Sequence, residues 1–350
     1  MRLARLAAAT LAVVALANAP GAAASASSAA TVRVIRNIQY GVADGAPLLV
    51  DAYLPAAGGL YPAVVAIHGG AWWSGDKSEW ASSCRQLAAV GFACFSVNYR
   101  LAPRYPFPAA VDDVTAATRW IRENADRYGV DPTRLGAIGS SAGGHLAAMI
   151  GVLGDGPTDA GARVNAVVSW SGVFDFATYD RDLPTESLQR VNDFVGCDVT
   201  LASCAPKAKE ASPVTSLDPS DPPMFLANSD AELVPVSQPM EMAADLKASG
   251  VPHEFFVIPG NHHGAELKNQ VIASSGQTVF AQSVAFLKRW IGVVSGGAAS
   301  SNGEMSGTPE VSEPSANGGS DRGGLLVAAG VVAALTAIAG GLALARRRLP

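Results

Sequence analysis

The chain has 350 residues and is 49% hydrophobic, whereas only 16% of its residues are charged and 7% are aromatic. This composition excludes intrinsic disorder for most of the chain. The formal net charge is −5 at pH 7, and it becomes more negative once the basic residues at the two ends are set apart. That charge argues against nucleic acid or an anionic lipid surface as a partner.

Residues 1–26 have the pattern of a secretory signal peptide. Arg2 and Arg5 precede a short apolar stretch, and an A-x-A site ends at Ala26. A basic head, a short apolar core and small residues at a cleavage site are typical of such a peptide, and the core is too short to span a bilayer. We therefore expect cleavage near Ala26 and export of the rest of the chain.

Residues 31–293 are predicted to form one α/β domain, since this length can build one large core. Two runs at its start are expected to pair antiparallel, and later apolar runs suit strands buried on both faces of a parallel sheet. Helical patterns between them predict an α/β doubly wound sheet, mostly parallel, with helices on both faces. In chain order the predicted elements are strands 32–40, 47–53 and 63–67, helix 79–90, strand 92–97, helix 109–128, strand 135–138, helix 142–153, strands 166–170 and 224–227, helix 237–249, strand 255–258 and helix 278–293.

The regular alternation stops between residues 173 and 214. This stretch has neither a clear helical period nor a strand period. We expect residues 173–214 to lie over the carboxyl edge of the sheet as a small cap.

The C-terminal part predicts a tether. Residues 295–324 are rich in Gly, Ser, Pro and Glu, which predicts a flexible linker. Residues 325–345 carry no charge, and a helix of that length is about 30 Å long, enough to span a bilayer. The three arginines that follow make residues 346–350 a predicted cytoplasmic tail. The chain is thus predicted to be anchored at the cell surface by a transmembrane helix, with the α/β domain outside.

The chain contains four cysteines. In an oxidising compartment they suggest two disulfides, for which three pairings exist. We favour Cys197 with Cys204, which closes a short loop, and Cys84 with Cys94, which joins a helix to the next strand. No C-x-x-C or clustered Cys/His spacing occurs, so no metal site is predicted.

A candidate nucleophile lies between a strand and a helix. Residues 139–143 read Gly-Ser-Ser-Ala-Gly, and such a G-x-S-x-G exposes its central hydroxyl in a tight turn at a helix N-terminus. The pentapeptide alone is a weak signal, since an ordinary Gly-rich loop can have the same letters. Its place after strand 135–138 favours Ser141 as the nucleophile.

A candidate oxyanion hole follows strand 63–67, where the chain reads His-Gly-Gly-Ala-Trp. Acyl transfer develops negative charge on a carbonyl oxygen, and small residues let backbone N–H groups approach it. We assign two donors to Gly70 and Ala71 and a third to Ala142, the residue after the nucleophile. Trp72 either lines the acyl pocket or packs in the core.

The base and the acid are expected later in the chain. The loop Pro-Gly-Asn-His-His-Gly at residues 259–264 follows a predicted strand, and its pattern favours His263 over His262 as the base. The acid should follow strand 224–227, because the order is nucleophile, acid and then His. Asp230 and Glu232 both lie there, and either could orient His263 and stabilise its cation.

Taken together, these runs resemble the hormone-sensitive-lipase-like esterase group of the α/β hydrolases. Asn-Tyr-Arg-Leu-Ala-Pro at 98–103 and Phe-Pro-Ala-Ala-Val-Asp-Asp at 107–113 complete the pattern, which covers about residues 45–293. The resemblance implies an α/β-hydrolase fold, hydrolysis of carboxylic esters by a Ser-acid-His triad, small to medium acyl groups and no cofactor. Similar secreted members include acetyl and feruloyl esterases.

The sequence departs from that group at the acid. The group usually has its carboxylate three residues before the Val of a Val-Pro pair, and that residue here is Ala231. We favour Glu232 as the acid, because its longer side chain can make up an offset of one position, with Asp230 as the alternative.

Three other functions use the same features. A prolyl-oligopeptidase-like serine peptidase shares the elbow and the triad, but we expect no propeller domain in this chain. An envelope acyltransferase is compatible with the same residues. A non-catalytic binding module at the cell surface is disfavoured by the intact Ser141 and His263.

Overall fold

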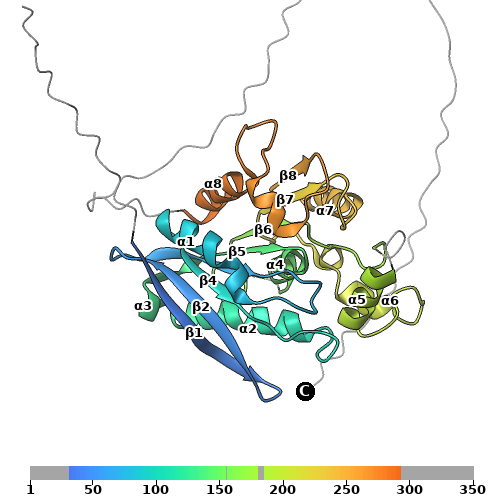
Figure 1. The fold of residues 1–350 in the computed structure, drawn as a ribbon, viewed down its shortest axis with the longest axis horizontal. Coiled ribbons are helices and arrows are strands. Elements are labelled where there is room, and N and C mark those ends of the chain that lie inside the picture. The colour runs from blue at the N-terminus through green and yellow to red at the C-terminus, as the bar shows by residue number, and fades with distance from the viewer. Residues whose placement is uncertain (1–30, 155, 180–184, 293–350) are drawn as a thin grey trace, which may run out of the picture. The chain divides into compact units, whose positions relative to one another are not determined.

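In the computed structural model, which describes residues 31–154, 156–179 and 185–292, the framework is an eight-stranded sheet of order β1-β2-β4-β3-β5-β6-β7-β8 (Figure 1). The first two strands form an antiparallel hairpin that joins β4 antiparallel, and all other pairs are parallel. The predicted mostly parallel sheet is therefore confirmed. The strands are β1 (Val32–Ala43), β2 (Ala46–Pro55), β3 (Tyr61–Ile67), β4 (Ala93–Val97), β5 (Val130–Ser140), β6 (Ala166–Trp170), β7 (Met224–Ser229) and β8 (His253–Ile258).

Helices cover both faces of the sheet because its central strands are apolar on both sides. Along β3, Val64 packs in the core beneath α1 (Ala81–Ala89) and α8 (Val279–Ile291). Its neighbour Val65 packs in the opposite core with residues of the other helices, as the alternation of side chains along a strand requires. The helices of that second layer are α2 (Ala109–Glu123), α3 (Ala125–Tyr128), α4 (Ala142–Val152) and α7 (Ser237–Ala248).

The segment predicted as a cap contains two helices that the sequence pattern did not predict. They are α5 (Thr185–Val195) and α6 (Ala205–Glu210), and they lie together on the side of the molecule away from α1 and α8 (Figure 1). Short 3-10 turns complete the fold: η1 (Lys77–Trp80), η2 (Pro213–Ser216) and η3 (Gly264–Asn269).

Both predicted cysteine pairs are bonded in the structure. One disulfide joins Cys84 in α1 to Cys94 in β4, and the other joins Cys197 to Cys204 between α5 and α6. The second bond closes the loop that connects the two cap helices.

The predicted transmembrane helix has to be removed from the fold class. Across the described ranges, no helix combines the length and the apolar character needed to cross a membrane. The segment for which the span was predicted, residues 325–345, lies outside these ranges, as do the predicted signal peptide 1–26, linker 295–324 and tail 346–350. The fold that the described residues support is the α/β-hydrolase architecture, and the predicted transmembrane helix is not part of it.

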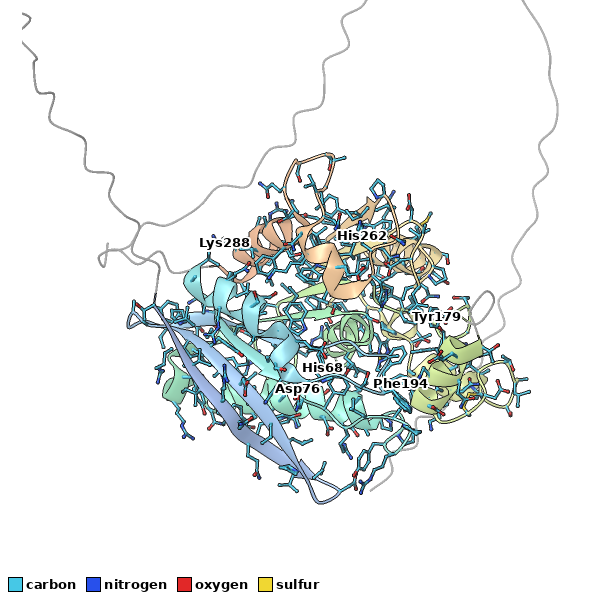
Figure 2. All side chains as sticks on the ribbon, in the orientation of Figure 1. His68, Asp76, Tyr179, Phe194, His262 and Lys288 are labelled. Carbon is cyan, nitrogen blue, oxygen red and sulfur yellow. A yellow bond between two sulfur atoms is a disulfide. The ribbon has the colours of Figure 1, made fainter. Side chains whose placement is uncertain are left out.

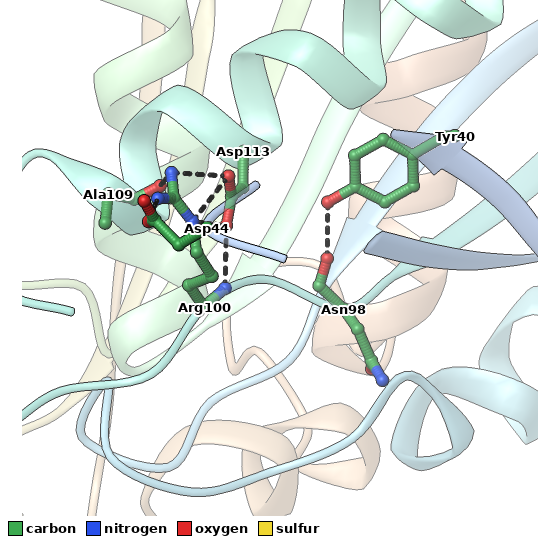
Figure 3. Close-up of polar contacts among 6 residues, drawn as sticks. All are labelled: Tyr40, Asp44, Asn98, Arg100, Ala109 and Asp113. Carbon is green, nitrogen blue, oxygen red and sulfur yellow. Dashed lines mark hydrogen bonds and ion pairs between the residues drawn. The ribbon is translucent and has the colours of Figure 1, made fainter. Parts of the chain in front are cut away.

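Arg100, which follows β4, ties the hairpin and α2 to the centre of the sheet (Figure 3). Its guanidinium forms two N–H to oxygen pairs with Asp113 of α2, at 2.8 and 2.9 Å, and a further ion pair with Asp44 in the hairpin turn. Nearby, the Tyr40 hydroxyl donates to the Asn98 carbonyl at 2.6 Å. The side chain of Asp113 is only 2% exposed, so this pair is shielded from water.

We expect Asp113→Ala to lower the free energy of unfolding by about 3–5 kcal/mol, because it leaves the largely buried Arg100 charge without its main partner. Urea titration followed by circular dichroism measures this. Asp44→Asn is the matched control: that carboxylate is 60% exposed, asparagine tolerates the positive φ of 49° at this turn position, and the loss of the charge should cost under about 1 kcal/mol. Equal losses in the two variants would contradict this account.

Candidate active site

Ser141 lies in a strained turn between β5 and α4. Its φ is 55° and its ψ is −124°, and such a conformation in a residue with a side chain costs about 1–3 kcal/mol. The flanking glycines are required by close contacts. A Cβ on Gly139 would lie 2.0 Å from the Gly143 carbonyl oxygen, and one on Gly143 would lie 2.1 Å from that of Ile67. The G-x-S-x-G spacing therefore has a steric origin in this fold.

His263 connects the Ser141 hydroxyl to a buried carboxylate. Its Nε2 is 2.9 Å from Ser141 Oγ, and its Nδ1 contacts Glu232 Oε2. An ionised carboxylate can only accept, so Nδ1 carries the ring proton and Nε2 accepts from the serine hydroxyl. The Glu232 side chain is fully buried and the His263 side chain is 28% exposed. This arrangement can remove a proton from Ser141 and stabilise the resulting imidazolium.

The structure brings Glu232, and not Asp230, to the histidine. Asp230 is exposed, and its Oδ1 accepts from the Gly260 backbone N–H at 2.8 Å. The N–H of the next residue, Ala231, donates to the Gly260 carbonyl at 3.0 Å. These bonds join the loop after β7 to the loop after β8, and the turn that they stabilise directs the side chain of Glu232 inward. Asp230 thus has a structural contact in place of a contact with His263.

The loop after β3 holds its backbone close to Ser141. Gly70, Ala71 and Trp72 have φ values of 105°, 52° and 58°. A Cβ on Gly70 would lie 2.2 Å from the Ser74 carbonyl oxygen, so only glycine fits there. Gly70 and Ala71 line the same pocket as Ser141.

Ala142 is the first residue of α4, and the N–H groups of a first helical turn have no partner within the helix. Its N–H is therefore available beside the serine. Gly70 and Ala71 in the pocket wall and Ala142 next to Ser141 stay the predicted oxyanion donors.

A pocket of about 510 Å³ opens above Ser141 and His263. Its buried wall includes Val173, Tyr179 and Val191, and Figure 2 shows Tyr179 on the cap side of the molecule. At the rim, Trp73 is 42% exposed, and the Arg190 guanidinium lies over its ring at 3.6 Å. The cap helix α5 therefore contributes to the pocket, which the sequence pattern alone did not predict.

Trp72 lines this pocket and also packs in the core, and its predicted place beside an acyl group stays a prediction. Its ring stacks on Phe194 of α5 at 4.4 Å between centroids, and its Nε1 donates to His145 Nδ1 at 3.0 Å. Because Nδ1 accepts, Nε2 of His145 carries the proton and donates to the Ala211 carbonyl at 2.8 Å. One chain of bonds thereby joins the loop after β3, helix α4 and the cap.

His145 is a residue whose part in the site the sequence did not reveal, and Ser171 is another. Full burial lowers the pKa of His145 to about 4 against a weaker opposing effect of the Ala211 carbonyl, so the ring is neutral at pH 7.

Among the described residues no group of His, Cys, Asp and Glu has the composition of a metal site. The expectation of a cofactor-free site stays a prediction.

Comparison with known proteins identifies the family. Residues 50–246 match the family described as BD-FAE. The chain belongs to the BD-FAE family. The probable carboxylic ester hydrolase LipM of Mycobacterium tuberculosis is 31% identical over 218 residues, 60% of this chain and 50% of LipM. Esterase LipC of the same organism is 30% identical over 219 residues, 59% of this chain and 53% of LipC. The chain spans about half the length of these relatives.

Solved structures agree with this assignment. A truncated carbohydrate esterase from gut microbiota is 27% identical with a TM-score of 0.64, over 76% of this chain and 98% of that one. The esterase Est2 of Thermogutta terrifontis, 24% identical with a TM-score of 0.59 over 77% of this chain and 96% of that one, shows the same fold. The predicted α/β-hydrolase esterase group is therefore confirmed.

We expect His145→Gln to flatten the pH dependence of stability, because glutamine can make both hydrogen bonds without titrating. Between about pH 6.5 and pH 4 the unfolded wild type binds a proton that the folded protein excludes, so its stability falls as pH falls. Titration of His145 should therefore lower the free energy of unfolding of the wild type by about 3 kcal/mol over this pH range. Urea titrations at pH 7 and pH 4 measure the change in the free energy of unfolding of each protein. The buried His68 is present in both proteins and contributes equally to the two changes. An equal loss of unfolding free energy in the wild type and in His145→Gln would contradict the conclusion that His145 is a buried neutral ring.

Proposed function

We propose that this BD-FAE domain is a serine hydrolase of carboxylic esters, with Ser141, His263 and Glu232 as its catalytic triad. The observation that carries the proposal is the hydrogen-bonded series from the Ser141 hydroxyl through His263 to a fully buried carboxylate at the base of a pocket. Relatives named carboxylic ester hydrolase and esterase support the choice of esters.

The mechanism follows from the donors and acceptors present. His263 Nε2 takes the hydroxyl proton as Ser141 Oγ attacks the ester carbonyl, while Glu232 stabilises the imidazolium. The N–H groups of Gly70, Ala71 and Ala142 bind the oxygen that becomes negative. The alcohol leaves with the proton from His263. Water, activated by the same histidine, then cleaves the acyl-enzyme.

The substrates that fit best are esters of small to medium acyl groups. The buried part of the pocket is lined by apolar side chains, among them Trp72, Val173 and Val191. Such a wall favours an uncharged acyl group through burial of apolar surface.

We also propose that the domain works outside the cytoplasm. Both of its cysteine pairs form disulfides, and disulfides persist in oxidising compartments.

Ser141→Ala should abolish turnover, since no other group replaces the attacking oxygen. With p-nitrophenyl butyrate we expect kcat to fall by about 10⁴-fold or more, and covalent labelling by a fluorophosphonate to disappear. Spectrophotometry and mass spectrometry measure these two effects. A wild-type protein that neither hydrolyses the ester nor takes up the label would overturn the proposed function.

Replacing the two carboxylates should have very different effects. Glu232→Ala removes the partner of His263 Nδ1, and we expect kcat to fall by about 10⁴-fold. Asp230→Ala removes only the bond to the Gly260 N–H, so its kcat should stay within about threefold of the wild type. Steady-state kinetics on the purified proteins decide this, and the reverse order would exclude Glu232 as the acid.

A further inference from the structure

Ser171 has a conformation that a serine adopts only at a cost. It directly follows β6, it is fully buried, and its φ is 51°. Ser140 pairs with Trp170 across β5 and β6, so Ser141 and Ser171 hold equivalent places beyond two neighbouring strands. A positive φ in a residue with a side chain costs about 1–3 kcal/mol, and glycine would avoid it. The hydroxyl must therefore make interactions that offset this strain.

The Ser171 hydroxyl joins the two segments that carry the base and the acid. Its Oγ donates to Glu232 Oε1 at 2.8 Å and accepts from the Gly264 N–H at 2.9 Å. Because an ionised carboxylate only accepts and a backbone N–H only donates, the direction of both bonds is determined. Gly264 is the residue after His263, so the hydroxyl lies between the acid and the backbone of the base.

The other hydrogen bonds of these segments differ from this link. The second bond to Glu232 Oε1 comes from the N–H of Ser229, the last residue of β7, at 3.1 Å and does not reach the segment of His263. The Asp230 bond to Gly260 joins the two loops at an exposed position. Ser171 adds a buried link, anchored to the sheet by the bond from its N–H to the Ala227 carbonyl at 2.9 Å.

We propose that Ser171 is a positioning residue that holds His263 and Glu232 in the geometry needed for proton transfer. This inference rests on the proposed hydrolase function. Loss of the hydroxyl leaves the Gly264 N–H buried without its acceptor and removes one donor from Glu232. The imidazole then shifts relative to Ser141, while the pocket walls stay in place. The chemical step slows and substrate binding does not change.

Ser171→Gly and Ser171→Ala in the full chain test this with p-nitrophenyl butyrate. For both we expect kcat to fall by about 10- to 100-fold, as for a displacement of about 1 Å, with KM within about twofold of the wild type. The rate of fluorophosphonate labelling should fall in parallel. Ser171→Gly also relieves the backbone strain, so its melting temperature should be at least that of Ser171→Ala. This variant keeps the test decisive if the alanine protein folds poorly.

Ser169→Ala is the matched control. Ser169 is buried in β6 two residues before Ser171, but its Oγ has no hydrogen-bond partner in the part of the chain that the structure describes. Its loss removes no such bond, and kcat should stay within about twofold of the wild type.

The possible outcomes separate the two proposals. An active wild type with an equally active Ser171→Gly overturns the positioning role and leaves the esterase function intact. A rise in KM at unchanged kcat, or an equal loss in Ser169→Ala, overturns it as well. A wild type without turnover or labelling overturns both proposals.

Discussion

The buried carboxylate of Glu232 is the constraint on which the candidate site depends. A charge without access to water is stable only when it is paired and hydrogen-bonded. Its oxygens contact the Nδ1 of His263, the Ser171 hydroxyl and the Ser229 N–H. Ser229 is the last residue of β7, whereas Ser171 and His263 follow β6 and β8. The burial of one acid thus requires that three strand ends meet in a single geometry.

The parallel sheet makes that meeting possible. In a parallel sheet the carboxyl ends of all strands reach the same edge, and that edge is where α/β folds bind ligands. The loops after β3, β5, β6, β7 and β8 meet there. Close backbone contact between β3 and the start of α4, at Ile67 and Gly143, then brings the loop after β3 close to Ser141. The sheet is buried on both faces, and it holds these turns in their strained backbone conformations.

Much of the fold was predictable because the signals were local. Continuous apolar runs indicated the central strands, and the cysteine spacing indicated both disulfides. Helix 109–128 was predicted as one element, but it breaks at Asn124 into α2 and α3. The cap helices were missed, although α5 is as long as α4, because no regular alternation of strands and helices surrounds them.

The sequence by itself determined which turn, histidine and glycine loop are the candidates for nucleophile, base and oxyanion hole, because each depends on glycines and motif spacing within a few residues. It left Asp230 and Glu232 both open, and it gave no sign of Ser171. Those roles depend on where side chains point in irregular turns. Hydrogen bonds between segments far apart in the chain set those directions, so only the tertiary structure decided which carboxylate contacts His263 and which hydroxyl supports that contact.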